Sequence, residues 1–462
     1  MEKSQGKSIE NSFFRVFLGG MAWSSGSSFL IKVAGLLYTF FLLRYLGLKE
    51  YGTYQIVLSA YGLLSIFFLP GIEDVVLARA SAMLGERKGG EASSLGAGYA
   101  VMLILCTIFV FLLGVVFSII AMRRGMFGVD IIRYFDLLLL LLFLLPLERI
   151  ILFDSGLHHD FARQNGYSLV REGARLITGI VAVVSFNDKI LWLILTTIFS
   201  YSIAIFAFGN SILKRYLLVQ EKKIGFNEVI SLVKKQGPWL ITQRVMRQLE
   251  KNCRPFFVQF FLGREAVGLF SLADKLLTHV MTLLPASTVL VPLLARIRNE
   301  KQRVRRIFTL GIKYSIPLYS VYTVASYLCL PILFQYAFPT YAAALPLFNV
   351  LLLYIPMTGV AFLLTALFVS LQEQKNMAII SIGRSVLTVI IAPLGILAFG
   401  IKGIVYEYII TLYLFLAARY VLLRHIDPEL GIDLREILHW DSSDSARCRL
   451  VLGKLAHFVI RG

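Results

Sequence analysis

The stretch that decides the fold is GAGYAVMLILCTIFVFLLGVVFSII, residues 96–120, which contains no charged side chain. A helix needs about 20 consecutive apolar residues to cross the hydrocarbon core of a bilayer, so this stretch predicts a transmembrane helix. Similar apolar blocks recur along most of the chain, in which 57% of the residues are hydrophobic and 16% are charged. Soluble domains have about 45–50% apolar and 25% charged residues. The sequence therefore predicts a polytopic membrane protein.

We expect an all-α integral membrane protein with about twelve transmembrane helices. Because the bilayer core holds no water, each spanning segment must satisfy its own backbone hydrogen bonds, and an α-helix does so. The predicted spans lie at about residues 16–43, 52–73, 96–120, 133–153, 170–187, 190–213, 237–262, 267–295, 309–335, 345–371, 376–398 and 401–423.

The distribution of Lys and Arg predicts the orientation of these helices. Loops on one side are rich in cations, as in segments 214–236 and 296–306, whereas the loops on the other side hold few. An excess of cations marks the cytoplasmic loops of helical membrane proteins. We therefore expect both termini in the cytoplasm.

The net charge of +18 follows from this topology without a nucleic-acid partner. Basic cytoplasmic loops lie against an anionic leaflet, where each cation gains about 1 kcal/mol. We expect membrane lipids to be the partners of these loops, and we expect no binding of nucleic acid.

The sequence contains an internal repeat. Residues 45–54 read YLGLKEYGTY after the first span, and residues 261–270 read FLGREAVGLF after the seventh. Each has an aromatic residue, Leu and Gly, then a second Gly five residues after the first and an aromatic residue two positions further. Six spans per repeat give both halves the same orientation. This predicts two six-helix lobes related by a pseudo-twofold axis along the membrane normal, as in transporters that rock two bundles about a central site.

The repeat also predicts the division of the chain. The N-terminal lobe would comprise residues 1–213 and the C-terminal lobe residues 237–423. Residues 214–236 would form a basic cytoplasmic linker between them. Residues 424–462, which carry charges of both signs, would form a cytoplasmic tail.

The first repeat motif resembles a known signature. Residues 44–54 match the pattern Arg-x-Leu-Gly-x-x-x-Tyr-Gly-x-Tyr of polysaccharide-biosynthesis membrane proteins, and the stretches 333–344 and 400–404 also fit this family. These proteins are the Wzx-like O-antigen flippases of the multidrug/oligosaccharidyl-lipid/polysaccharide exporter (MOP) superfamily. The resemblance covers roughly residues 10–425.

The resemblance implies an alternating-access transporter in the cytoplasmic (inner) membrane. Its cargo would be an undecaprenyl-pyrophosphate-linked oligosaccharide, which moves from the inner to the outer leaflet for the biosynthesis of a surface polysaccharide. We expect the monomer to be functional.

The seventh span carries an unusual row of cations. Arg244, Arg247, Lys251 and Arg254 are spaced three, four and three residues apart, which places them within an arc of about 80° on one helix. A cation at the centre of the membrane costs about 2.5–3.5 kcal/mol, so these four side chains cannot all face lipid. We expect them to line a hydrated cavity and to bind phosphate, because Arg meets phosphate oxygens with a planar fork and Lys adds a point charge.

Two structural alternatives stay open for this row. The segment could instead be an amphipathic helix on the inner membrane surface, with its basic face toward the lipid headgroups. Glu250 could also pair with Arg247 or Arg254, which would give those cations a structural role.

Other charged residues in predicted spans are candidates for the same site. Lys32 in the first span could face the cavity with the cations of the seventh span, or extend to the membrane interface. Asp274 and Glu407 are candidates for coupling to H⁺ or Na⁺. Asp274 could instead pair with a neighbouring cation, and Glu407 could form a hydrogen bond between packed helices.

The sequence shows no sign of an enzyme. It contains no G-x-x-x-x-G-K-[ST] motif, no G-x-G-x-x-G fingerprint, no H-E-x-x-H and no cluster of Cys and His. We expect no metal, no cofactor and no catalytic residue. The energy for transport would then come from an ion gradient, the membrane potential or consumption of the product.

Rival functions make different demands on the residues of the spans. A cation-coupled multidrug extruder of the same superfamily would need carboxylates in the cavity, whereas this chain places cations on its seventh span. A membrane glycosyltransferase or polymerase would need a large outer loop or an acidic catalytic cluster. A structural scaffold is the remaining class.

Overall fold

The structure is a computed structural model that describes residues 30–431 except 70, 126, 159, 218–221, 236, 283–300, 338 and 372. Every regular element in this part of the chain is a helix. The predicted start of the first span, the cations of segment 296–298 and the tail beyond residue 431 lie outside the described residues.

The first half of the chain forms a helix over residues 30–45 and eight further α-helices. In order, these and the short 3₁₀ turns between them are α2 (Leu48–Leu64), η1 (Ser65–Phe68), α3 (Ile72–Gly85), α4 (Gly89–Arg124), α5 (Val129–Leu139), η2 (Leu140–Phe143), α6 (Leu145–Leu157), α7 (Phe161–Ser185), α8 (Lys189–Leu217) and α9 (Lys222–Lys235).

The second half begins with α10, whose bounds Gly237–Leu262 coincide with the predicted seventh span. The elements that follow in the described chain are α11 (Arg264–Thr282), α13 (Lys301–Ala337), η3 (Pro339–Ala344), α14 (Leu345–Leu351), η4 (Leu352–Tyr354), α15 (Ile355–Ser370), α16 (Gln374–Phe399), α17 (Ile401–Ile426) and η5 (Pro428–Leu430).

Two of the predicted spans are interrupted rather than continuous. Span 133–153 corresponds to α5, η2 and α6, and span 345–371 corresponds to α14, η4 and α15. Pro146 and Pro356 each lie in the first turn of the helix that follows the interruption. Proline is tolerated there because its missing N–H would have no partner within the helix, whereas further along it would remove a hydrogen bond.

The all-helical membrane class is confirmed. Among the described residues, six helices are long and apolar enough to cross a membrane, and the pair α2–η1 and α3, bent by 42°, is a seventh candidate. Helices α7 and α10 match predicted spans, but they carry more charged residues than these six helices do in their apolar stretches. Their charges are the ones on which the candidate site depends.

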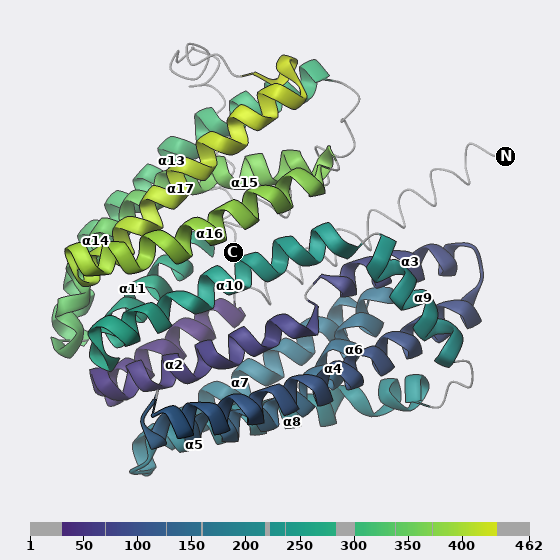
Figure 1. The fold of residues 1–462 in the computed structure, drawn as a ribbon, viewed down its shortest axis with the longest axis horizontal. Helices are drawn as coiled ribbons and strands as arrows, with labels where there is room; N and C mark the ends of the chain where they lie inside the picture. Colours follow the sequence, from purple (N-terminus) through teal and green to yellow (C-terminus); the bar gives the residue numbers. More distant parts are fainter. Residues whose placement is uncertain are drawn as a thin grey trace, which may run out of the picture. The chain divides into compact units, whose positions relative to one another are not determined.

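The helices group into two compact units by contact. Unit 1 contains residues Met1–Leu283, Cys329–Leu351 and Lys375–Thr411, and unit 2 contains Leu284–Leu328, Leu352–Gln374 and Leu412–Gly462. Unit 1 therefore includes the described helices of the first half together with α10, α11, the end of α13 from Cys329, η3, α14, α16 and the first part of α17, up to Thr411 (Figure 1). The division into two lobes of six helices stays a prediction.

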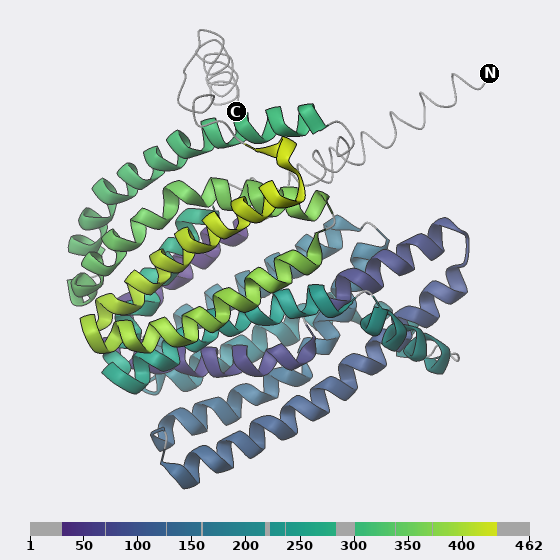
Figure 2. The ribbon, with the colours of Figure 1, turned by 45° about the horizontal axis from the view of Figure 1, so that its top comes forward.

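Two helices outside the predicted spans lie at one end of unit 1. The basic linker is largely helical, and its helix α9 packs closely on α4 (Figures 1 and 2). A Cβ on Gly98 or Gly225 would overlap the backbone of the other helix at this crossing. Arg79 of α3 also pairs with Glu228 of α9. The linker is therefore a packed element of unit 1.

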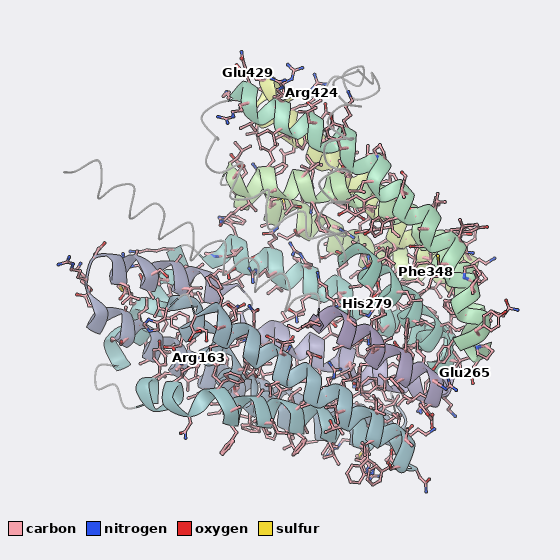
Figure 3. The ribbon with its side chains drawn as sticks, turned by 180° about the vertical axis from the view of Figure 1, so that it is seen from behind. Arg163, Glu265, His279, Phe348, Arg424 and Glu429 are labelled. Atoms are coloured by element: carbon pink, nitrogen blue, oxygen red, sulfur yellow. The ribbon has the colours of Figure 1, made fainter. Side chains whose placement is uncertain are left out.

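The orientation of the helices in the membrane stays a prediction, and Figure 3 shows two residues of unit 1 from loops that were predicted on opposite sides. It shows Arg163, from a predicted cytoplasmic loop, at the end opposite Glu265, which follows a predicted outer turn. His279 lies further along α11, between these two ends. We call the end with Glu265 the outer end and the end with Arg163 the inner end.

Candidate functional site

The two repeat motifs meet each other at the outer end of unit 1. Gly52 of α2 and Gly268 of α11 are equivalent positions of the repeat, and the two helices cross there. A Cβ on Gly52 would overlap the carbonyl oxygen of Arg264, and one on Gly268 would lie 2.5 Å from that of Leu48. Only glycine permits so close an approach of two helix backbones.

A third family-like stretch joins this contact. Tyr341 in η3 donates a hydrogen bond to the Leu46 carbonyl oxygen, at 2.9 Å. Its ring meets the ring of Tyr51 edge to face, with 6.0 Å between centroids. The motifs that resemble the family therefore contact one another at this end of unit 1.

An ion pair links the same region to α5. Arg264 pairs with Asp130, with 3.1 Å between Nη2 and Oδ1. Partial burial opposes ionisation of Asp130, but its hydrogen bond to Arg264 and the charge of that guanidinium lower the pKa of the carboxyl. These two residues also line a polar cavity of about 460 Å³, together with Glu50 and Lys189, which are 4.0 Å apart.

The four cations of α10 have three different surroundings. Arg244, near the inner end, turns toward α3 and pairs with Asp74 and, at 3.6 Å, with Glu73. Arg244 therefore joins two helices. Its phosphate-binding role would require these pairs to open.

Arg254 lies at the other edge of the row, in a dry network of charges. It is 3% exposed, and Glu407 of α17 is 0% exposed. The Nε and Nη2 atoms of Arg254 donate to the two oxygens of Glu407 at 2.9 and 3.2 Å. Nη2 also pairs with Glu250 at 2.7 Å, and Glu250 pairs with Arg384 at 2.8 Å. The Thr388 hydroxyl donates to Glu407 at 2.7 Å.

This network differs from the expectation for Arg254 and Glu407. The sequence predicted Arg254 in a hydrated cavity and offered Glu407 for ion coupling. In the structure two cations and two carboxylates balance each other, and the role of Glu407 in ion coupling stays a prediction. The alternative in which Glu250 pairs with a cation of the row holds for Arg254.

Arg247 and Lys251, in the middle of the row, are the exposed members. They are four residues apart and lie on one face of α10. Asp274 and Lys275 of α11 are within electrostatic range of Lys251. Asp274 is also beside Tyr408, whose ring lies 4.1 Å from the guanidinium carbon of Arg254. Lys32 is partly exposed in helix 30–45.

Sequence reasoning missed a second group of cations, on α7. Arg171 pairs with Glu148 and Glu172, and Arg175 lies over the ring of Tyr38 at 4.7 Å. The buried Nε atom of Arg175 has no hydrogen-bond partner among the described residues.

Arg175 is also close enough to Lys275 for their charges to interact. Arg171 and Arg175 are four residues apart in the predicted span 170–187, so the signal was present in the sequence.

The described residues include no group of three or more His, Cys, Asp or Glu side chains placed to hold a metal ion. The charged residues of unit 1 are instead guanidinium and ammonium groups with carboxylates as neighbours. This arrangement can bind an anion once the ion pairs at its edge give way.

Comparison with solved structures identifies the fold. A multidrug resistance MATE family transporter of the MOP superfamily, in an inward-facing conformation, superimposes with a TM-score of 0.72 at 12% identity over 86% of this chain and 95% of its own. The lipid II flippase MurJ, in an inward closed conformation, gives 0.65 at 14% identity over 95% and 97%. A MOP superfamily transporter from Pyrococcus furiosus, described by the reverse polarity of its binding pocket, gives 0.63 at 14% identity over 89% and 94%.

The chain therefore has the fold of the transporters and flippases of the MOP superfamily. Residues 17–298, more than half of the chain, match the model of the family described as polysaccharide biosynthesis protein, and the chain belongs to this family. No individual curated protein sequence matches it significantly.

Proposed function

We propose that this protein is a flippase that moves an undecaprenyl-pyrophosphate-linked oligosaccharide from the inner to the outer leaflet by alternating access. It would do so in the cytoplasmic (inner) membrane, with both termini in the cytoplasm, as a monomer and without catalysing a reaction. Membership of the polysaccharide biosynthesis family supports the pathway. The exposed pair Arg247 and Lys251 on α10 is the single observation that supports this cargo.

The chemistry of the pair fits a diphosphate. Arg247 can offer two parallel N–H donors and Lys251 a compact charge. A diphosphate that leaves water needs several cations to offset its desolvation. Arg175 and Lys275 lie within electrostatic range of each other, as do Lys251 and Lys275, and they extend the proposed site. Lys32 stays a candidate, whereas Arg244 and Arg254 act in this proposal mainly as structural cations.

The proposal keeps the domain boundaries derived from the repeat. Residues 1–213 and 237–423 would be the two rocking lobes, 214–236 their linker and 424–462 a cytoplasmic tail. Asp274, whose charge interacts with that of Lys251, is the carboxylate that we retain for coupling to H⁺ or Na⁺.

The alternative function is a cation-coupled multidrug extruder, which the MATE transporter with the same fold brings into consideration. A drug cation would need carboxylates without cationic partners. Glu250 and Glu407 both pair with guanidinium groups, and Asp274 lies among cations. The charges of this unit therefore favour an anionic cargo. The P. furiosus transporter with a pocket of reverse polarity indicates that this fold accommodates different charges.

The test is rescue of a bacterial strain that lacks the flippase of this protein's own polysaccharide pathway. We expect the wild-type chain to restore surface polysaccharide and the variant Arg247→Glu/Lys251→Glu to abolish it at equal membrane abundance. The matched control is Lys234→Glu/Lys235→Glu, which changes two exposed cations of α9 by the same charge. Full export by Arg247→Gln/Lys251→Gln would contradict the phosphate-binding role.

A further inference from the structure

The break between α2 and α3 has a strained backbone. Leu69 has a φ of 51° and Gly71 a φ of 102°, and the two helices are bent by 42° at this point. A left-handed conformation is unusual for a residue that carries a side chain, and it persists only where the surrounding structure holds it. Such strain clusters at ligand sites and at segments that switch. The contacts that hold this break therefore decide whether α3 can move.

One set of contacts comes from Arg149 of α6. Its Nη1 atom donates a hydrogen bond to the Phe68 carbonyl oxygen at 3.3 Å, and its guanidinium carbon lies 5.5 Å from the centre of the Phe68 ring. The same Nη1 atom lies 3.8 Å from a carboxylate oxygen of Glu73, in the first turn of α3. Arg149 therefore ties both sides of the break to a helix of the first half of the chain.

The other set comes from Arg244 of α10. Arg244 pairs with Asp74 and, at 3.6 Å, with Glu73. A Cβ on Gly71 would lie 2.9 Å from the Cδ atom of Arg244, so glycine leaves room for this side chain. The side chains of Arg244 and Asp74 stay 36% and 50% exposed. An anion can therefore reach this pair without displacing buried side chains.

Arg244 also belongs to the row of cations on α10. It lies three residues before Arg247 and seven before Lys251, or about 4.5 and 10.5 Å along the axis and about 60° and 20° around it. The proposed diphosphate site is thus on the same side of the helix. A guanidinium group binds phosphate with the same paired N–H donors that it offers to a carboxylate. Phosphate and the carboxylates of α3 can therefore compete for Arg244.

We propose that Arg244 changes partner during transport: its pairs with Asp74 and Glu73 give way to a bond with the diphosphate of the cargo. This inference rests on the proposed function and adds how cargo binding reaches the helices. Loss of these pairs frees the first turn of α3 from α10, whereas Arg149 keeps that turn tied to α6. Helix α3 then pivots at the strained break.

The first experiment removes the carboxylate that competes for Arg244. Asp74→Asn keeps the shape of the side chain and takes away its charge. The apparent affinity for a polyprenyl diphosphate depends on the fraction of protein in which Arg244 is available, so we expect this variant to bind about tenfold more tightly than the wild type. Unchanged or weaker binding by Asp74→Asn would overturn the inference.

The matched control is Glu228→Gln. Glu228 of α9 pairs with Arg79 of α3 at 3.2 Å, and both side chains are partly exposed. This variant removes the same charge and loosens α3, but it frees no cation of α10. It should bind the polyprenyl diphosphate as the wild type does. An equal gain in the control would overturn the inference, because the cause would then be net charge or a loose α3.

A double-mutant cycle tests whether the gain depends on Arg244. In the Arg244→Gln background, Asp74→Asn should no longer raise the affinity. A gain that persists there would contradict the exchange of partners. A purely structural ion pair predicts a different pattern, in which Asp74→Asn and Arg244→Gln both lower the melting temperature and neither binds more tightly.

The second experiment follows α3 in the wild-type protein by hydrogen exchange in phosphatidylcholine nanodiscs. Polyprenyl diphosphate should raise the exchange of residues 72–85, and Arg244→Gln should show the raised exchange without any ligand. Phospholipid headgroups also carry phosphate, so the measurement is repeated with phosphatidylglycerol and no polyprenyl lipid. The same rise with phosphatidylglycerol alone, or no rise with polyprenyl diphosphate, would overturn the inference.

These outcomes separate the inference from the proposed function. If Asp74→Asn gains no affinity while Arg247→Gln/Lys251→Gln still loses it, only the exchange at Arg244 is wrong. If the wild-type protein does not bind polyprenyl diphosphate, the proposed function is wrong as well.

Discussion

The substitution Glu407→Gln tests whether the buried network of unit 1 is structural. Arg254 loses the charge of the carboxylate that accepts its Nε–H and one Nη2–H, and it keeps only Glu250, which it shares with Arg384. The cluster changes from two cations and two anions to a net positive charge, at a site where Glu407, Arg254 and Glu250 are 0–8% exposed. Removal of one partner from a buried ion pair costs about 3–5 kcal/mol.

We expect a destabilisation of about 3 kcal/mol, at the lower end, because Gln can still accept one hydrogen bond and Glu250 still pairs with Arg254. The measurement is the melting transition of the purified protein in detergent, followed by tryptophan fluorescence. The double variant Arg254→Met/Glu407→Leu removes both charges and should be less destabilised than Glu407→Gln. Glu265→Gln, at an exposed position of α11, should have the same melting temperature as the wild-type protein.

Two results would refute this reasoning. Glu407→Gln could melt at the wild-type temperature, which would mean that the pair contributes little. It could also keep its stability and lose a dependence of transport on a cation gradient. In that case Glu407 would be a coupling carboxylate and not a structural one.

Three further predictions concern the packing contacts and the ion pair at the two ends of unit 1. Gly268→Ala should weaken the contact between α2 and α11 by about 1–3 kcal/mol, because its Cβ would press on the Leu48 carbonyl oxygen. The thiol labelling of an introduced Thr53→Cys should then rise. Gly85→Ala, with open space around it, should leave this labelling unchanged. The pKa of Asp130 is lowered by Arg264, so this ion pair persists at neutral pH and is lost only as the pH falls below the usual carboxyl value of 3.8. Thiol reagents react with the thiolate, so the test is made at neutral pH, where Asp130→Asn should raise the labelling of Thr53→Cys. Gly98→Leu should separate α9 from α4 and expose the linker to protease, and unchanged proteolysis would contradict the packed linker.

The spans were predictable because each depends on a local run of apolar residues. The bounds of α10 coincide with the prediction, although that helix carries more charges than an ordinary transmembrane helix. Helices α3 and α9 were missed because they are short, and because α9 is held by a glycine contact with α4 that no local pattern encodes. The repeat glycines were found in sequence, but their contact depends on how two distant helices cross.

The candidate site was predictable only in part. Helix geometry correctly places the four cations of α10 within one arc. The side chains that contact each cation, and the exposure of each cation, nevertheless differ from one position to the next. Glu407 is 153 positions from Arg254, and the pairing between α10 and α17 cannot be read from either segment alone. The surroundings of Arg175 on α7 were missed for the same reason, since they depend on side chains from several helices.

The most direct measurement is the affinity of the purified protein for a polyprenyl diphosphate and for the corresponding monophosphate. A charge-assisted hydrogen bond contributes about 1.5–3 kcal/mol, so loss of two should weaken binding about 100-fold or more. We expect Arg247→Gln/Lys251→Gln to bind the diphosphate at least 100-fold more weakly and to lose its preference over the monophosphate, whereas Lys234→Gln/Lys235→Gln should bind as the wild type does. Equal affinity of the two double variants would show that the exposed cations of α10 do not hold the cargo.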